Sequence, residues 1–199
     1  MDNILERAKA IVLKPVETWQ VIKGEKVGIN QLFFNYAAKL ALIPAICGLI
    51  GLTIVGIRLP AGNLMRIPFL SVFMAQAAGY VVGLASLWIG AWIMKALAPK
   101  FGAKADLDLA LVVMIYAMTP AWLIGVVTLI PGLAFLGLFA LYAIYLLAKG
   151  LAIVLETPSD KVVLFTVSLL AISVLVNFVL NALLTSRFYA PMYMQMLSS

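Results

Sequence analysis

Five long apolar stretches dominate this 199-residue chain and restrict the folds that are open to it. They cover approximately residues 33–57, 70–97, 108–130, 132–154 and 162–185. Each is long enough to cross a bilayer as a helix, which takes ~20 mostly apolar residues, and none carries a charge near its middle. A soluble domain with 65% hydrophobic and 11% charged residues could not cover its surface with polar groups. We therefore expect an integral membrane protein.

The apolar stretches also select the type of secondary structure. Inside a bilayer the backbone must satisfy its own hydrogen bonds, which leaves helices or a closed barrel. Unbroken apolar runs without alternation exclude the barrel. We predict an all-α fold: a bundle of five transmembrane helices in residues 33–185, preceded by a cytoplasmic amphipathic segment, residues 1–32, and followed by a short outer tail, residues 186–199.

The N-terminal segment divides at Pro15, because proline opens a helix readily but breaks one in its interior. Apolar residues recur at helical spacing on both sides of it, which predicts two short amphipathic helices, with Gly24 ending the second. Such helices can lie in the membrane interface. We expect Trp19 on the second helix to contact a partner or another helix.

The distribution of lysine and arginine predicts the orientation, because basic residues are retained on the cytoplasmic side. Eleven lie on the side of the N-terminus: Arg7, Lys9, Lys14, Lys23, Lys26, Lys39, Lys95, Lys100, Lys104, Lys149 and Lys161. The other side has three, namely Arg58, Arg66 and Arg187. This ratio predicts a cytoplasmic N-terminus and an outer C-terminus. Since the basic residues are spread over helix ends, we expect no nucleic-acid partner.

The residue types that carry most enzyme chemistry are scarce. The chain has no histidine, which excludes a histidine-based triad and an HExxH zinc site. Its eight carboxylates all lie outside the centres of the spans, and its one thiol, Cys47, has no second cysteine to pair with. We expect no metal, no cofactor and no enzymatic activity. An intramembrane enzyme is the weakest interpretation, since no nucleophile–base pair is visible.

The second span carries small residues at nearly four-residue steps: Ala75, Gly79, Gly83 and, further along, Gly90. Small residues let another helix approach closely. This stripe indicates either packing within the bundle or a surface for a membrane-protein partner or a second copy of the chain.

Three amides lie inside spans, where an unpaired polar group is unfavourable. Gln76 lies in the second span, and Asn177 and Asn181 lie one turn apart in the fifth. They either form hydrogen bonds between helices or line a polar path. The second interpretation gives an alternative function, a small transporter or channel for a neutral or lipidic solute.

Three sequence motifs resemble those of the Yip family, a family of five-span membrane proteins named for Ypt/Rab-interacting proteins. They are KPVETWQVIKGE with Pro15 and Trp19, YAMTPAWL with Tyr116, Thr119, Pro120 and Trp122 followed by Pro131, and LYAIYLLAKGL with Tyr142, Tyr145 and Gly150. Their order and spacing follow the family from about residue 4 to residue 185. The same prolines and tyrosines also suit a kinked hairpin of the third and fourth spans.

The resemblance implies a bacterial multi-pass protein of the cytoplasmic (inner) membrane. Eukaryotic relatives act with small GTPases through long cytoplasmic N-terminal regions, and the short region here argues against that partner. We expect a non-enzymatic scaffold, accessory or regulatory subunit of a membrane complex or of membrane organisation. Its expected partners are the lipid bilayer and another membrane protein or a second copy.

Overall fold

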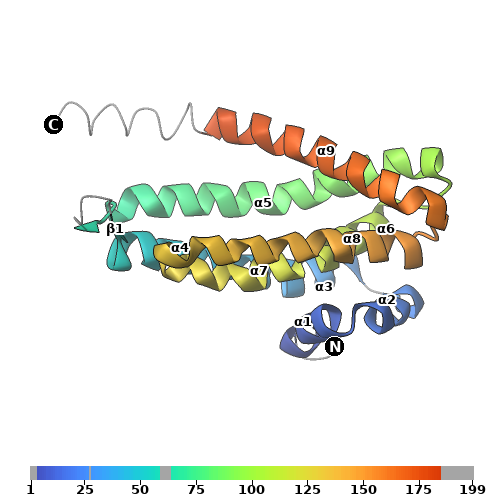
Figure 1. Ribbon diagram of the computed structural model, residues 1–199, viewed down its shortest axis with the longest axis horizontal. Helices are drawn as coiled ribbons and strands as arrows, with labels where there is room; N and C mark the ends of the chain where they lie inside the picture. Colours follow the sequence, from blue (N-terminus) through green and yellow to red (C-terminus); the bar gives the residue numbers. More distant parts are fainter. Residues whose placement is uncertain (1–3, 27, 59–63, 185–199) are drawn as a thin grey trace.

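The computed structural model describes residues 4–26, 28–58 and 64–184, with the side chains of residues 58, 177, 180, 181, 183 and 184 left aside. Within this part the chain is a helical bundle, which confirms the predicted fold class (Figure 1). Five helical stretches are long and apolar enough to cross a membrane: Ile29–Val55, Phe69–Phe101, Leu107–Leu129, Pro131–Ile153 and Ser159–Val176. The predicted tail, residues 186–199, lies outside the described residues.

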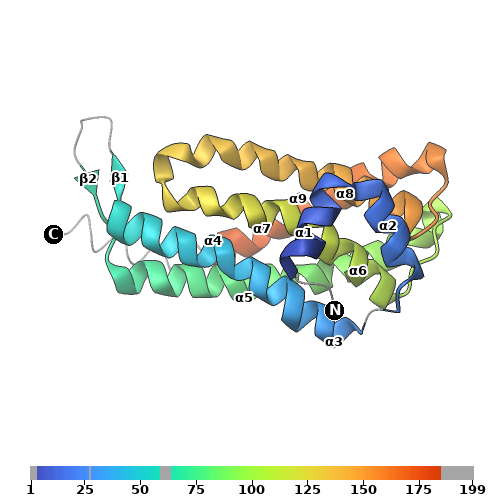
Figure 2. The same ribbon diagram turned by 90° about the horizontal axis from the view of Figure 1, so that it is seen from below.

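Two short helices precede the first span, α1 (Ile4–Leu13) and α2 (Pro15–Gly24). Pro15 occupies the first turn of α2, and the hydroxyl of Thr18 donates a hydrogen bond to the carbonyl of Lys14 at 2.8 Å. Both helices lie on one side of the bundle (Figure 1), and α1 runs across the long axis of the spans (Figure 2). A helix in this orientation lies parallel to the membrane plane.

The first span is one continuous helix built from four segments, α3 (Ile29–Leu32), η1 (Phe33–Ala37), α4 (Ala38–Ile50) and η2 (Gly51–Val55), of which η1 and η2 are π-helical. A short antiparallel pair of strands, β1 (Ile57–Arg58) and β2 (Leu64–Met65), then leads into the second span. That span comprises α5 (Phe69–Leu97) and the 3₁₀ turn η3 (Ala98–Phe101). The strand pair was not predicted from the sequence.

The third span begins at the N-cap Asp106, whose carboxylate accepts the backbone N–H of Leu109 at 2.7 Å. The remaining elements are α6 (Leu107–Ala117), α7 (Thr119–Ile124), η4 (Gly125–Leu129), η5 (Pro131–Leu141), α8 (Tyr142–Ile153) and α9 (Ser159–Leu184). The third and fourth spans form a tight hairpin that turns at Pro131 (Figure 2). Both of its arms are 3₁₀-helical near the turn.

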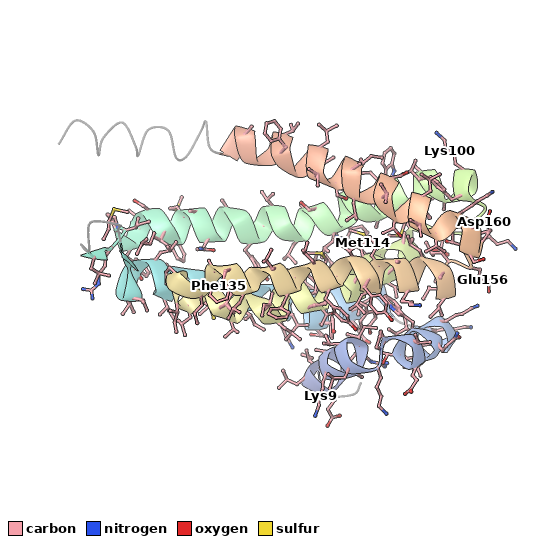
Figure 3. All side chains as sticks on the ribbon, viewed as in Figure 1. Lys9, Lys100, Met114, Phe135, Glu156 and Asp160 are labelled. Atoms are coloured by element: carbon pink, nitrogen blue, oxygen red, sulfur yellow. The ribbon has the colours of Figure 1, made fainter. Side chains whose placement is uncertain are left out.

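The buried core is concentrated at one end of the bundle, the end that carries α1, α2 and the α5–α6 and α8–α9 loops. Lys100, Glu156 and Asp160 lie at this end, whereas Phe135 lies toward the other (Figure 3). We name it the basic end after Lys100, Lys104 and Lys161, which lie in or beside these loops. Helix α6 forms the centre of the core: 61% of the third span is buried, against 11% to 28% of the other four.

Helix α9 packs on α5, α8 and η3. Phe165 and Leu169, near its start, are buried, whereas Val174, Leu175 and Phe178 are exposed. Its second half therefore points away from the bundle (Figure 1). Toward this far end the helices expose apolar side chains, as contact with lipid requires.

Candidate functional site

Trp19 connects the N-terminal helices to the bundle. Its side chain is fully buried and lies edge-on to Tyr116 of α6, with ring centroids 6.1 Å apart. Gly150 of α8 makes this position available, because a Cβ there would lie 3.0 Å from Cζ2 of Trp19. The apolar faces of α1 and α2 also pack on protein, with Ala8, Ile11 and Ile22 buried. The predicted amphipathic segment therefore directs its apolar face at the bundle.

A buried hydrogen bond extends this contact to the first span. The hydroxyls of Tyr36 in η1 and Thr119 in α7 lie 3.0 Å apart, and the ring of Tyr36 lies 5.1 Å from that of Tyr116. We name the five residues Trp19, Tyr36, Tyr116, Thr119 and Gly150 the docking core. Its members come from α2, η1, α6, α7 and α8, so it joins the N-terminal segment to three spans.

One polar atom of the docking core lacks a partner. The indole N–H of Trp19 is buried and meets no hydrogen-bond acceptor among the described residues. A buried donor without a partner is uncommon in folded proteins and lowers stability by ~1–3 kcal/mol. Trp19 is therefore held by packing, since the indole N–H contributes no hydrogen bond within the described chain.

Two ion pairs involve the segment: one lies within it, and the other joins it to the bundle. Arg7 of α1 contacts the Glu25 carboxylate at 2.6 Å, and Lys23 of α2 contacts Glu156 in the α8–α9 loop at 2.6 Å. The hydrogen bond and positive charge of Lys23 lower the pKa of Glu156 below its ordinary value. Glu156 holds a left-handed backbone with φ 53°, which is unusual for a residue other than glycine.

A second cluster lies where α1 meets the hairpin. The hydroxyl of Tyr142 donates a hydrogen bond to the carbonyl of Val12 at 3.0 Å. Tyr145 stacks on Tyr142 with ring centroids 5.3 Å apart, and the ammonium of Lys149 lies 5.5 Å from the centre of the Tyr145 ring. These three side chains form a row along α8 that leads toward the basic end.

Beside this row is an open cavity of about 450 Å³, which we name the hairpin pocket. It is lined by Val12, Pro120, Leu123, Ile124, Phe139 and Tyr142. Its volume falls within the ~300–1,000 Å³ that is typical of small-molecule sites. Its lining is apolar apart from the Tyr142 hydroxyl, whose proton is already donated to α1.

Comparison with known proteins shows the family of the chain. The Yip1 domain matches residues 9–180. The chain belongs to the Yip1 family. Two similar proteins are named inner membrane protein YohC, from Escherichia coli strain K12 and from E. coli O6:H1 strain CFT073. Each is 31% identical over 173 residues, which is 85% of this chain and 89% of the relative. No solved structure matches significantly.

Membership in the Yip1 family confirms the resemblance seen in the sequence, and the five apolar helices agree with a multi-pass protein of the inner membrane. Seven of the ten motif residues lie at two neighbouring places. Trp19, Tyr116, Thr119 and Gly150 belong to the docking core, while Pro120, Tyr142 and Tyr145 surround or adjoin the hairpin pocket. Pro15 opens α2, Pro131 opens η5 at the turn, and Trp122 is buried in α7.

The small-residue stripe of this Yip1-family chain divides along α5. Gly90 is buried, and a Cβ there would collide with Met114 of α6. Gly79 and Gly83 are exposed, with no described atom within 4 Å of where a Cβ would stand. Ala75 is half-buried. One part of the stripe is therefore used within the bundle, and the other part is open.

The three amides of the expected polar path are described unequally. Gln76 is half-buried beside Gly48 of the first span, where its Nε2 atom lies 2.5 Å from the position of a Cβ. Asn177 and Asn181 lie on α9, and their side chains are outside the described part of the structure. The polar path stays a prediction.

Several residues of the site could not be singled out from the sequence. Tyr36, Val12 and Phe139 lie among ordinary apolar neighbours outside the three motifs, and Lys149 lies inside LYAIYLLAKGL, where the sequence marks it only as a basic residue at a helix end. The Pro44–Gly125 contact, in which a Cβ at Gly125 would lie 2.6 Å from that of Pro44, joins spans one and three and was also missed. The only indication of this contact in the sequence is the presence of a proline and a glycine inside two apolar spans.

Proposed function

We propose that this Yip1-family chain is a non-enzymatic scaffold or accessory subunit of the inner membrane. It binds another membrane protein, or a second copy of itself, along Gly79 and Gly83 of α5. The exposure of these two glycines is the observation that carries the proposal.

Glycine in a helix is unfavourable by ~1 kcal/mol relative to alanine, so a helical glycine needs a compensating contact. Five other span glycines face a neighbour: a Cβ would meet Gln76 at Gly48, the carbonyl of Thr128 at Gly51, Met114 at Gly90, Pro44 at Gly125 and Trp19 at Gly150. Gly132 and Gly137, in the 3₁₀ segment η5 at the tip of the hairpin, are open as Gly79 and Gly83 are, but only the α5 pair lies at helical four-residue spacing. Gly79 and Gly83 have no such neighbour among the described residues. Since small residues favour close helix contact in membranes, a helix of another chain fits this surface.

The remaining parts of the proposal rest on the residue inventory. The absence of histidine from the sequence favours a non-enzymatic role. The excess of lysine and arginine at the basic end favours a cytoplasmic N-terminus. Fusion of a reporter to the C-terminus tests this orientation: a periplasmic enzyme reporter should be active there and a cytoplasmic fluorescent reporter should be dark.

Lateral association is tested by purifying the chain from its source membrane in native nanodiscs and measuring the mass and composition of the particles. Gly79→Leu and Gly83→Leu should remove a stoichiometric partner or dissociate a homo-oligomer. Ala85→Leu is the matched control, because Ala85 is also exposed on α5 but lies on a different face. If both glycine variants keep the association of the wild type, α5 is not the contact surface.

A further inference from the structure

We propose that the hairpin pocket binds one acyl chain of an anionic phospholipid, whose phosphate lies against Lys149. The site is formed by the end of α1, by α7 and by η5 and α8, and it is separate from the glycines of α5 on which the proposed function rests.

The lining of the pocket determines which part of a lipid enters it. Five of its six residues carry only carbon in their side chains, and the hydroxyl of Tyr142 already donates to the carbonyl of Val12. No free donor remains in the lining to recognise a polar headgroup. Val126 and Phe139 nearby are exposed, as expected for a surface in hydrocarbon. An acyl chain therefore matches the pocket, and a polar solute does not.

The position of the pocket agrees with a lipid in the leaflet at the basic end. Helix α1 crosses the bundle axis and provides one wall through Val12 (Figure 2). An acyl chain in the pocket would thus lie beside a helix that is parallel to the membrane plane. The headgroup would extend along α8 toward the basic end.

The charge on that side favours an anionic headgroup. Lys149 follows Tyr142 by seven residues, so both lie on the same face of α8. Its ammonium stays over the ring of Tyr145, which itself stacks on Tyr142. Lys149 forms no ion pair among the described residues, whereas Lys14 near the other rim has the Glu17 carboxylate at 3.7 Å. Lys149 is therefore the cation available to a phosphate.

Native mass spectrometry of the delipidated full chain tests the proposal, with phosphatidylglycerol and phosphatidylcholine of the same acyl chains as probes. Val12→Trp and Ile124→Trp fill the pocket from two different elements of its lining, α1 and α7. Each should lower bound phosphatidylglycerol at least about tenfold, the loss of roughly two buried methylene groups. Leu13→Trp and Val126→Trp change exposed neighbours outside the lining and should bind as the wild type does.

The headgroup is tested separately. Lys149→Gln should lower the preference for phosphatidylglycerol over phosphatidylcholine about fivefold, as expected for one lysine near a membrane surface. Glycerol phosphate, which has the charge without a chain, should not compete. Equal binding by both pocket variants and the wild type overturns the site. Equal retention of the two lipids by the wild type, or retention of an uncharged lipid instead, overturns the anionic headgroup.

Discussion

Replacing Trp19 with alanine should release α1 and α2 from the bundle, whereas replacing it with phenylalanine should not. The indole is fully buried between Gly150 and Tyr116, and its N–H meets no acceptor among the described residues. The two variants separate packing from hydrogen bonding because both remove the N–H while only phenylalanine keeps a ring.

The structure gives the sizes of these effects. Truncating a fully buried tryptophan to alanine lowers stability by about 3–5 kcal/mol. Phenylalanine keeps most of the ring contact. The carbon groups that it lacks lower stability by ~1–2 kcal/mol, at ~0.8 kcal/mol for each buried group. Removal of an unsatisfied buried donor regains about 1–3 kcal/mol. For Trp19→Phe the two terms nearly cancel, so we expect a net change within about 1 kcal/mol.

Cysteine labelling in nanodiscs measures the release directly. In a Cys47→Ala background, Ala8→Cys places one thiol on the buried face of α1. Its rate of reaction with a maleimide follows the fraction of time that the segment is undocked. Trp19→Ala should increase this rate by more than about 100-fold, which corresponds to ~3 kcal/mol, and Trp19→Phe should change it by less than about fivefold.

The exposed Trp92 provides the control, since Trp92→Ala should leave the rate unchanged. If the phenylalanine variant labelled as fast as the alanine variant, a hydrogen bond from the indole N–H would be holding the segment. The reasoning from packing would then be wrong.

Three further changes test other contacts. Tyr36→Phe leaves the buried hydroxyl of Thr119 without its partner and should lower the free energy of unfolding by about 1–3 kcal/mol. A double-mutant cycle with Thr119→Val, measured by thermal unfolding, should show that the effects of the two substitutions are not additive. Gly125→Ala forces a Cβ against Pro44 of α4 and should lower the free energy of unfolding by ~1–3 kcal/mol in the same assay. Unchanged stability would show that the first and third spans do not pack tightly at this contact. Because Lys23 lowers the pKa of Glu156 in the folded chain, their pair should stabilise docking above the ordinary value of 4.5 and lose this effect as pH falls through the lowered pKa. Glu156→Gln should remove the acid dependence that remains in the ratio of the Ala8→Cys labelling rate to that of an exposed cysteine, a ratio that cancels the pH dependence of the thiol itself.

The class and the spans of the protein could be predicted because their causes are local. Twenty apolar residues suffice to define a span, and Asp106 caps α6 through an atom only three residues away. Pro15 and Gly24 likewise mark the bounds of α2 through their own backbone properties. Such features require no knowledge of what lies opposite in the fold.

The docking core could not be predicted, because its contacts join distant parts of the chain. Tyr36 and Thr119 are 83 residues apart, and neither has neighbours that mark a partner. An amphipathic helix has the same pattern whether its apolar face meets lipid or protein, so the sequence could not tell whether Trp19 meets a partner or another helix of this chain. Gly83 and Gly90 share a face of α5, and only the course of α6 determines that one of them is covered.

The uneven distribution of the core links the shape of the protein to the thickness of its bilayer. A hydrophobic helix longer than the local hydrocarbon responds by tilting, whereas a shorter one thins the bilayer around it, each at a modest energy for each ångström of mismatch. The second half of α9 and the tip of the hairpin are exposed, whereas the basic end is tightly packed. In a thinner membrane the far ends of these helices can therefore tilt while the docking core keeps its geometry.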